Sequence, residues 1–491
     1  MKTREQLREK GQFWTPDWVA KAMIAYVARL PDTILDLGVG AGAFYDALLT
    51  NYENAKQYNY LGVDIDDDLL ESLNKRKVSS THHFQKKDYI LENIPETFGA
   101  IISNPPYIRH HRLSQDTKKK LTDISVKLLG KKIDGRAGIH VYFLLLALKN
   151  LKKDGRLAFI MPADTCEGIF AKDVWSYITS HYCLEAVATF SPKSTPFPKI
   201  DTNAVVFLIR NRQKKQHIYK VHCNTLSEQG LFNVIKSNFM ESNNDVEVTK
   251  VDLDKALKVG LSRDSNAFVE HAFVLRDFAK VVRGIATGEN DFFFMNSKIK
   301  SELNLEDEYF IRAIGRTRDI TDESITDDLL DKLDKQGRPT YLLSLDGVPF
   351  KDLSQNIQKY IKLGEAKGIN KKALISTRNP WYKMEVRKSP PFLFAYLGRR
   401  NVRFIKNDAT AVPLTSFLCV YPNKSDKEYI QKLWKVLNHP DTLANLKFVG
   451  KSYGSGAIKV EPRSLENLAI PDEVIKNYGL LPSTHAQMTF I

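Results

Sequence analysis

The chain has 491 residues, which is too long for one ordinary hydrophobic core, so we expect two or three domains. Hydrophobic residues make up 43% of the sequence, which excludes general disorder, and the formal charge of +14 favours a polyanionic partner such as nucleic acid. The charged N-terminus lacks the apolar core of a signal peptide, the longest apolar run (Val141–Leu148) is too short to cross a membrane, and the four scattered cysteines predict no disulfide framework and no metal site.

The first half of the chain alternates short apolar runs with amphipathic stretches. We predict strands at Thr33–Leu37, Tyr60–Asp64, Ala100–Ser103, Arg156–Met161 and Thr202–Arg210, and helices at Ala43–Leu49 and Ile139–Leu151. Strands that alternate with helices predict an α/β fold with a doubly wound, Rossmann-like parallel sheet. Polar residues accumulate in 241–255, so we expect a linker there that separates a first domain, 1–245, from an irregular, mixed α+β second domain, 246–491.

A glycine-rich stretch, DLGVGAGAF (36–44), follows the first predicted strand and opens a helix. Gly38, Gly40 and Gly42 allow a tight turn and a close approach of the backbone to a ligand. Gly38, Gly40 and Ala43 also satisfy the dinucleotide-binding fingerprint. This motif alone does not separate NAD from another adenosine cofactor, or from a glycine turn that binds nothing.

Three acidic residues at successive strand ends separate these cofactors. Asp36 would repel a pyrophosphate but attract a cationic ammonium or sulfonium group. Asp64 can accept hydrogen bonds from ribose hydroxyls, and Asp88 from an adenine amino group, although a solvated turn aspartate is the alternative for Asp88. With the neighbouring Ile65 and Tyr89, this set favours S-adenosyl-L-methionine.

The tetrapeptide Asn104-Pro105-Pro106-Tyr107 ends the predicted strand at 100–103. The Asn104 side-chain oxygen and the Pro105 carbonyl can accept hydrogen bonds from a planar amine such as N6 of adenine, next to the cofactor's methyl group. Pro105 and Pro106 would keep these acceptors rigid, and Tyr107 would stack on the base. A Pro-Pro turn with a helix-capping asparagine is the alternative.

Two segments are rich in basic residues. Residues 109–136 contain nine Lys and Arg against three acids, and we expect a mobile loop there; residues 371–406 contain ten against one. A solvated basic surface with core aromatics is the alternative for each single residue. The predicted DNA contacts are Arg109, Arg378, Trp381, Tyr382, Lys383, Arg399, Arg400 and Arg403.

Four motifs in this order make the chain similar to the gamma class of N6-adenine DNA methyltransferases: FWTP (13–16), the glycine loop, NPPY and TPFPKIDTNAVVF (195–207). The resemblance implies that Thr15, Pro16 and Asn104 contact the methionine end and methyl group of S-adenosyl-L-methionine, and that Phe197 packs against an extruded base. Segments 281–293, 378–383 and 454–471 resemble pieces of that class's DNA target-recognition region.

The resemblance implies a site-specific DNA adenine-N6 methyltransferase, the modification component of a restriction–modification system in the cytoplasm of a bacterial or archaeal cell. Its partners would be double-stranded DNA and a cognate restriction endonuclease on a separate chain, because we see no room for a fused nuclease before residue 13. A methyltransferase acting on protein glutamine or on RNA could use the same NPPY geometry. A DNA-binding specificity subunit with a decayed methylase core is a further alternative.

Overall fold

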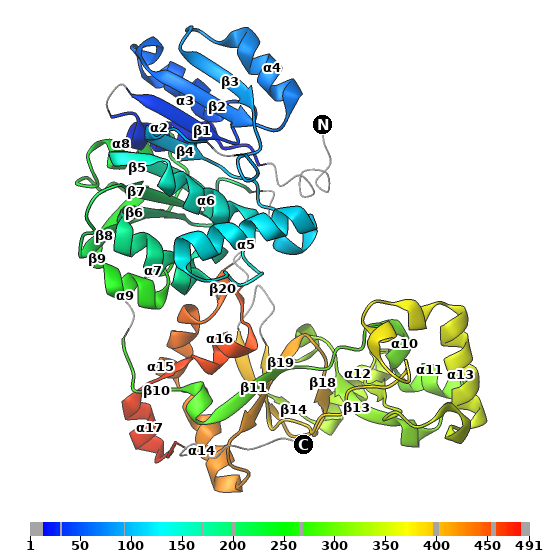
Figure 1. Ribbon diagram of the computed structural model, residues 1–491. Helices are drawn as coiled ribbons and strands as arrows, with labels where there is room; N and C mark the ends of the chain where they lie inside the picture. The colour runs from blue at the N-terminus through cyan, green and yellow to red at the C-terminus, as the bar shows by residue number, and fades with distance from the viewer. Residues whose placement is uncertain are drawn as a thin grey trace. The chain divides into compact units, whose positions relative to one another are not determined.

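The computed structural model describes residues 13–29, 32–92, 94–167, 170–198, 203–264, 269–395, 402–452 and 458–482. The chain forms two compact units, of which the first is Met1–Phe268 with Ser452–Gly456 and the second is Val269–Lys451 with Ala457–Ile491. The division after residue 268 lies later than the boundary predicted at 245, because segment 246–259 belongs to the fold of the first unit (Figure 1).

A nine-stranded sheet forms the centre of the first unit, in the order β3-β2-β1-β4-β5-β7-β6-β8-β9 (Figure 1). Its strands are β1 (Thr33–Leu37), β2 (Asn59–Asp64), β3 (His82–Lys86), β4 (Phe98–Ser103), β5 (Leu151–Pro162), β6 (Cys183–Phe190), β7 (Ala204–Arg210), β8 (His217–Cys223) and β9 (Val246–Asp252). The pairs that join β3, β2, β1, β4 and β5 are parallel, whereas β7 is antiparallel to both β5 and β6. This arrangement confirms the doubly wound fold and places a strand at each predicted position.

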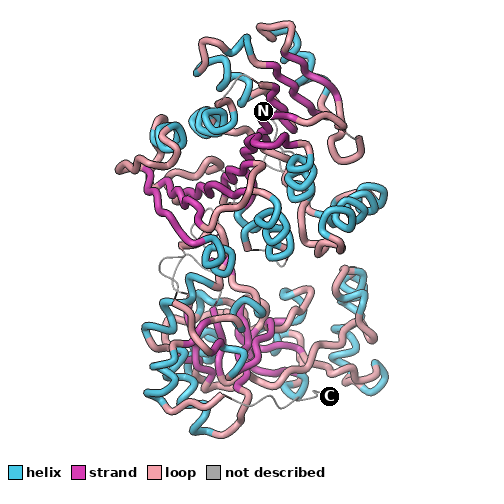
Figure 2. The backbone as a smooth tube through the Cα atoms, turned by 60° about the vertical axis from the view of Figure 1, so that its left-hand side comes forward, coloured by secondary structure: helices cyan, strands magenta, loops and turns pink. Residues whose placement is uncertain are grey.

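Helices cover both faces of this sheet, and Figure 2 shows them on either side of the strands. One face carries α2 (Asp17–Val27), α3 (Ala43–Asn51), α4 (Asp67–Arg76) and α8 (Gly230–Lys236); the other carries α5 (Gln115–Leu129), α6 (Ile139–Lys149), α7 (Ala171–His181) and α9 (Leu253–Val259). Strand residues alternate between two buried clusters: in β7, Val206 and Leu208 face the first set of helices, and Val205 and Phe207 face the second. Burial on both faces explains why these strands are continuously apolar.

Helix α2 fixes the position of the segment before it. The helix begins directly after Pro16, whose carbonyl accepts hydrogen bonds from the backbone amides of Val19 and Ala20 at 3.0 Å. Its buried alanines pack against a sheet face where the strands also present alanines, including Ala100 and Ala158, so helix and sheet approach closely. Residues 13–16 therefore extend from an element that is held firmly against the sheet.

Two segments differ from their predictions. Residues 246–252, expected in a linker, form β9, which pairs antiparallel with β8 and ends the sheet. Residues 109–136, expected to be a mobile loop, contain the 3-10 turn η2 (His110–Arg112) and the fifteen-residue helix α5. The α5 helix is stable because Ser114 caps its first turn, its apolar residues Leu121 and Ile124 are buried, and Gly130 ends it in a left-handed conformation.

The second unit has a mixed α+β architecture with a five-stranded sheet, β11-β19-β16-β17-β14, and a four-stranded sheet, β12-β15-β13-β18. Its strands are β10 (Phe273–Val274), β11 (Ala279–Arg283), β12 (Phe294–Met295), β13 (Phe310–Ile314), β14 (Ser324–Ile325), β15 (Tyr341–Leu343), β16 (Phe392–Ala395), β17 (Arg403–Asn407), β18 (Val412–Pro413), β19 (Phe417–Pro422), β21 (Ile458–Lys459) and β22 (Ala469–Ile470), and β20 (Lys451–Ser452) lies at its border. Its helices are α10 (Asn290–Phe293), α11 (Ser297–Glu302), α12 (Asp327–Lys335), α13 (Gln355–Ala366), α14 (Lys427–Leu437), α15 (Pro440–Ala444), α16 (Pro462–Glu466) and α17 (Asp472–Tyr478). Separate buried clusters support the two sheets.

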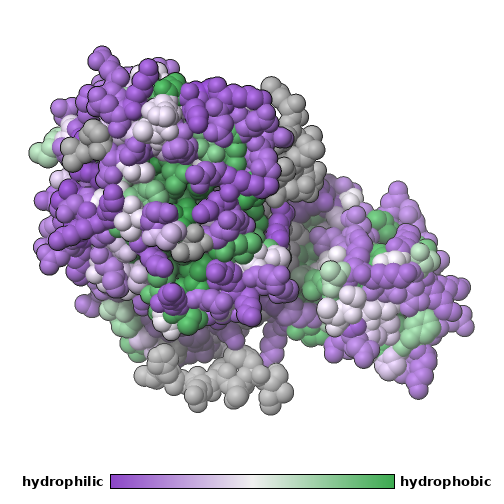
Figure 3. Space-filling view, turned by 45° about the horizontal axis from the view of Figure 1, so that its top comes forward, coloured by the Kyte–Doolittle hydropathy of each residue, from purple (hydrophilic) through white to green (hydrophobic). Residues whose placement is uncertain are grey.

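Hydrophilic side chains dominate the face of the molecule shown in Figure 3. Within the described residues, we find no helix whose length and apolarity would suffice to cross a membrane.

Candidate functional site

Asn104 lies directly after β4, at the edge of the sheet where the parallel strands β1, β2, β3 and β4 all end. Its side-chain Nδ2 donates hydrogen bonds to the Phe13 carbonyl at 2.7 Å and to Thr15 Oγ1 at 3.0 Å. Its Oδ1 is buried and has no hydrogen-bond partner. Because a buried acceptor without a partner is costly, this oxygen marks a place prepared for a donor from a ligand.

Three aromatic rings gather beside Asn104. The Phe13 ring lies 5.1 Å from the Tyr107 ring and 6.0 Å from the Phe197 ring, measured between centroids. The Tyr107 hydroxyl donates to the Ile160 carbonyl at 3.1 Å, which fixes the ring, and burial raises the pKa of Tyr107 well above its ordinary value. Tyr107 and Phe197 thus both lie next to Phe13, a residue to which the sequence assigned no role among the aromatic rings.

The glycine loop lies next to the same point. Gly38, Gly40 and Gly42 have φ values of 72°, 54° and 89°, which other residues rarely adopt. A methyl group on Gly38 would come within 3.8 Å of the Asn104 backbone carbonyl, and one on Gly40 within 3.4 Å of the Trp14 ring. The loop, the NPPY segment and the FWTP segment therefore meet in one place, and a half-exposed Trp14 is a further residue that was not predicted.

The Asp64 carboxylate, at the end of β2, is hydrogen-bonded to the glycine loop that follows β1. Its Oδ2 accepts from the Gly40 amide at 2.9 Å, while its Oδ1 accepts from the amides of Ile65 and Asp66 at 2.7 and 3.1 Å. The Ile65 side chain is 65% exposed beside it, an apolar surface suited to the flat face of a purine. The carboxylate retains capacity for a further donor, as a ribose contact would need.

We expect Asp64→Ala to weaken cofactor binding by about tenfold to a hundredfold, because a hydrogen bond to a charged group contributes about 1.5–3 kcal/mol. Titration calorimetry with S-adenosyl-L-methionine would measure the dissociation constant. Asp67→Ala is the matched control, since Asp67 lies on α4 and pairs with Lys86 on the surface. An unchanged dissociation constant in Asp64→Ala would contradict the ribose assignment.

Asp36 is fully buried under the glycine loop. Its Oδ2 accepts a hydrogen bond from the Tyr60 hydroxyl at 2.7 Å, and its Oδ1 has no partner. Burial raises the pKa of Asp36 to about 7; the Tyr60 hydrogen bond opposes this shift and the nearby Asp64 adds to it. A nearby cation would stabilise the ionised form of this buried carboxylate.

The raised pKa of Asp36 predicts that the cofactor-free protein loses stability as the pH rises from about 4 to about 7. Between these pH values the folded state keeps a proton on Asp36 that the unfolded chain has released. The free energy of unfolding therefore falls across this range, by about 4 kcal/mol in total once the pH exceeds 7. Asp36→Asn should therefore raise the melting temperature more at pH 8 than at pH 5. Thermal unfolding at both pH values tests this, and an equal change at both would contradict it.

Two of the remaining predicted cofactor residues have partners within the protein. Asp88 Oδ1 accepts from the amides of Ile90 and Leu91 at 2.9 and 3.1 Å, the geometry of a turn-forming aspartate, which is the alternative that the sequence left open. The Tyr89 side chain is buried against Phe143 and its hydroxyl donates to Asn150 at 2.9 Å. The Tyr89 side chain is therefore part of the core, and a cofactor contact by Tyr89 stays a prediction for its backbone.

His140 is a buried residue near the site that sequence analysis missed. It is only 5% exposed, its ring meets the Tyr107 ring edge-on at 5.7 Å, and neither of its ring nitrogens has a partner. Burial lowers the pKa of His140, while the carboxylate of Asp164 opposes this. His140 is therefore neutral near pH 7 and packs against the Tyr107 ring. Because His140 lies in the apolar helix α6, the sequence pattern did not indicate this contact.

The predicted DNA contacts divide into exposed and internal residues. Arg109 is exposed close to the NPPY segment, and Lys383 is exposed in the second unit. Tyr382 is only 3% exposed and donates to the Val348 carbonyl at 2.8 Å, so it is a core residue of the second unit and its assignment to DNA contact was wrong. Trp381 is partly buried against Phe292 and its Nε1 donates to Glu365 at 3.0 Å, so its assignment stays a prediction.

The predicted arginines of the second unit are also partly engaged. Arg378 donates to the Ala286 carbonyl at 2.6 Å, and Arg403 donates to the Ile320 carbonyl at 2.6 Å. Arg399 and Arg400 lie outside the described residues, as do residues 454–457 of the predicted C-terminal motif.

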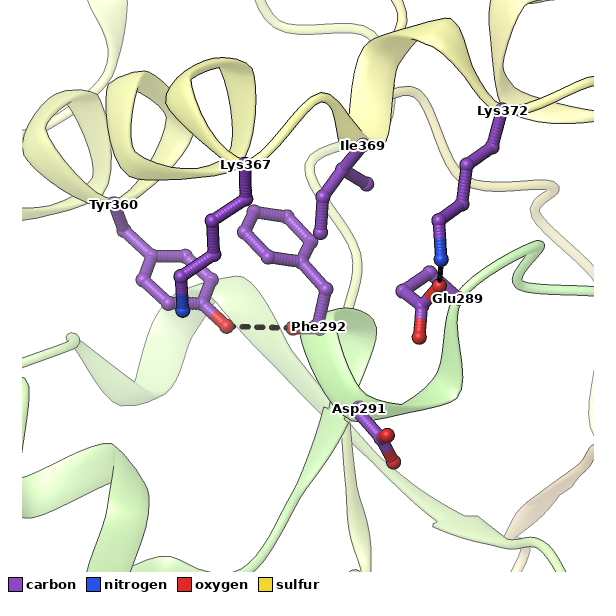
Figure 4. Close-up of a pocket in the computed structure, with 7 residues that line it drawn as sticks. All are labelled: Glu289, Asp291, Phe292, Tyr360, Lys367, Ile369 and Lys372. Atoms are coloured by element: carbon purple, nitrogen blue, oxygen red, sulfur yellow. Dashed lines mark hydrogen bonds and ion pairs between the residues drawn. The ribbon is translucent and has the colours of Figure 1, made fainter.

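Segments 281–293 and 371–383 come together in the second unit. Lys372 forms an ion pair with Glu289, and beside this pair a cavity of about 300 Å³ lies between residues 289–292 and residues 360–372 (Figure 4). The Tyr360 hydroxyl donates to the Phe292 carbonyl at 2.7 Å beneath it. The cavity is lined by Glu289, Asp291, Phe292, Tyr360, Lys367, Ile369 and Lys372.

Comparison with known proteins matches both parts of the chain. Residues 38–197 match the Eco57I restriction–modification methylase family, and residues 261–487 match the C-terminal domain of the type II methyltransferase M.Eco57I. The type II methyltransferase M.AccI of Acinetobacter calcoaceticus is 26% identical over 469 residues, which cover 94% of this chain and 85% of that protein. Both parts of the chain are therefore similar to type II restriction–modification methylases.

Two further comparisons concern the fold and the first part of the chain. The solved structure of the type IIL restriction–modification enzyme MmeI, determined with DNA, has a TM-score of 0.61 at 13% identity, covering 94% of this chain and 64% of that one. This likeness shows a shared fold. The release factor glutamine methyltransferase of Flavobacterium psychrophilum is 25% identical over 146 residues, only 29% of this chain and 50% of that protein.

Proposed function

We propose that this protein is a site-specific DNA methyltransferase that modifies N6 of adenine, with a cognate restriction endonuclease on a separate chain. The observation that carries the proposal is the buried, partnerless Oδ1 of Asn104 at the carboxyl edge of the sheet. Asn104 itself adjoins the glycine loop through its backbone carbonyl, and its side chain is hydrogen-bonded to Phe13, whose ring lies beside Tyr107 and Phe197. An acceptor in this position suits a flat amine held near a methyl donor.

The glycine loop and its acidic neighbours fit S-adenosyl-L-methionine. The partnerless oxygen of buried Asp36 calls for a cation, the Asp64 carboxylate can accept from ribose, and exposed Ile65 offers an apolar contact to adenine. A dinucleotide fits less well, because a buried carboxylate beside the loop would repel its pyrophosphate. When bound, S-adenosyl-L-methionine supplies an electrophilic methyl group on a sulfonium.

Asn104 and Pro105 would activate the amine rather than remove its proton first. The N6 lone pair of adenine is delocalised into the ring, which makes the nitrogen a weak nucleophile. Hydrogen bonds to Asn104 Oδ1 and to the Pro105 carbonyl would draw the nitrogen towards tetrahedral geometry and localise that lone pair. The nitrogen then forms the new N–C bond as the S–C bond of the donor breaks, and the extra proton leaves to water.

The target base must leave the duplex to reach Asn104, because adenine N6 is paired inside it. Extruding a base requires a few kcal/mol, which stacking on aromatic rings such as Tyr107 would offset by about 1–3 kcal/mol. The exposed basic residues of 109–132, including Arg109, Arg112, Lys119 and Lys120, follow the NPPY segment in sequence and would hold the phosphates.

The same amine geometry would suit a glutamine side chain or an RNA base. The likeness to a release factor glutamine methyltransferase covers only 29% of this chain, whereas residues 261–487, which include most of the second unit, match the C-terminal domain of the type II methyltransferase M.Eco57I. A substrate that needs only the catalytic unit leaves the second unit without a role. This observation favours DNA.

Incubation of the protein with labelled S-adenosyl-L-methionine and equal masses of plasmid DNA, total RNA and a glutamine-containing protein extract tests the substrate class. We expect label in DNA, and single-molecule sequencing should map it to one short sequence. Label in RNA or protein with unmodified DNA would overturn the proposal.

A further inference from the structure

The FWTP segment, Phe13–Pro16, is hydrogen-bonded to the side chain of Asn104. Both hydrogens of the Asn104 amide nitrogen are used by this segment, one by the Phe13 carbonyl at 2.7 Å and one by Thr15 Oγ1 at 3.0 Å. Thr15 is itself buried, and helix α2 anchors the segment against the sheet. The Asn104 amide is therefore held by hydrogen bonds to a segment that lies about ninety positions earlier in the chain.

These two hydrogen bonds determine the orientation of the Asn104 amide group. The terminal torsion of an asparagine is soft, so a free side chain exchanges its oxygen and nitrogen readily. If the amide of Asn104 were reversed, its oxygen would face the Phe13 carbonyl, and two acceptors would meet without a hydrogen between them. The nitrogen would then point to the place where Oδ1 now lies, and it would donate to the lone pair that must attack the methyl group.

We propose that Thr15 is a positioning residue that, with the Phe13 carbonyl, holds the Asn104 amide with Oδ1 towards the reacting amine. This inference rests on the proposed function, and it assigns Thr15 a role different from the cofactor contact that family resemblance implies. Thr15 acts through Asn104 and touches neither the base nor the methyl donor in this role. The same segment carries Phe13 into the aromatic group and Trp14 onto the glycine loop, so one short stretch aligns the parts of the site.

Thr15→Val keeps the shape of the side chain and removes the acceptor. We expect kcat to fall by about tenfold to a hundredfold, because one buried N–H loses its partner and the amide gains orientational freedom. The dissociation constant for S-adenosyl-L-methionine, measured by calorimetry without DNA, should change by less than about twofold, and Thr15→Ser should restore kcat to within about threefold. Thr50→Val is the matched control, because Thr50 is exposed on α3 and bonds only to the Asp46 carbonyl.

Equal melting temperatures for the two Thr15 variants would show that folding is not the cause. A Thr15→Val enzyme with a normal kcat, or one that loses only cofactor affinity, would overturn the positioning role, and so would a Thr15→Ser enzyme as slow as Thr15→Val. Asn104→Ala separates the two proposals. Normal turnover in Asn104→Ala removes the proposed mechanism, whereas an inactive Asn104→Ala beside a normal Thr15→Val removes only the role of Thr15.

Discussion

Replacement of Asn104 by alanine is expected to lower kcat by at least about a hundredfold to a thousandfold, the effect of removing one preorganised group that stabilises a transition state. The loss should fall on kcat, because the Oδ1 bond to the amine strengthens as the nitrogen becomes tetrahedral. The dissociation constant for S-adenosyl-L-methionine should stay within about threefold, since Asp36, Asp64 and the glycine loop remain.

Single-turnover rates with a cognate duplex and calorimetry with the cofactor would measure the two quantities separately. Asn150→Ala is not a suitable control, because Asn150 is buried and holds the carbonyls of Ile94 and Glu96. Asn74 on α4, whose Nδ2 donates to the carbonyls of Leu70 on α4 and Phe84 on β3, provides a milder comparison. A normal single-turnover rate in Asn104→Ala would contradict the catalytic assignment.

DNA affinity is expected to fall by about three to five orders of magnitude between 50 and 200 mM salt, if the protein neutralises about six to ten phosphates. The net charge of +14 and the exposed basic side chains of 109–132 are the physical basis for this expectation. Fluorescence anisotropy with a labelled duplex, measured over a salt series, gives the slope directly. A flat response would contradict binding through phosphate contacts.

Two pairs of lysine variants test which surface of the first unit contacts the DNA phosphates. Lys119 and Lys120 are exposed on α5, in the helix that follows NPPY, whereas Lys56 and Lys77 are exposed before β2 and β3, at the amino edge of the sheet. Lys119→Ala with Lys120→Ala should reduce the salt slope by about two, because each phosphate contact contributes about one. Lys56→Ala with Lys77→Ala, which removes the same charge, should leave the slope unchanged; equal effects of the two pairs would contradict a contact at α5.

The strands of the first unit could be predicted where burial on both faces made them apolar. β1, β4, β5 and β7 are of this kind, and their order with the glycine loop and NPPY was enough to indicate a doubly wound sheet. β3 was missed because His82 and Phe84 are buried but His83 and Gln85 are exposed, which leaves too few apolar residues for a pattern. β9 was read as a linker because it lies at the edge of the sheet and half of its residues are polar.

The sequence allowed us to predict which residue types lie at the candidate site, but not which of them contact one another. The residue types at successive strand ends indicated the cofactor loop and the amine acceptor. The hydrogen bonds of Asn104 to Phe13 and Thr15 join residues 91 and 89 positions apart, and no local pattern reveals such a pair. The same limit explains the error at Tyr382: aromatic residues among basic ones suggest a nucleic-acid surface, but here they close a core.

The most direct measurement is nucleoside mass spectrometry of plasmid DNA after incubation with S-adenosyl-L-methionine and either the wild-type protein or Asn104→Ala. The wild-type protein should produce N6-methyladenine and no other methylated base, and Asn104→Ala should produce at most about one hundredth of it at equal time. DNA that stays unmodified with the wild-type protein, whatever duplex sequence is supplied, or a methyl group found on cytosine, would contradict the account.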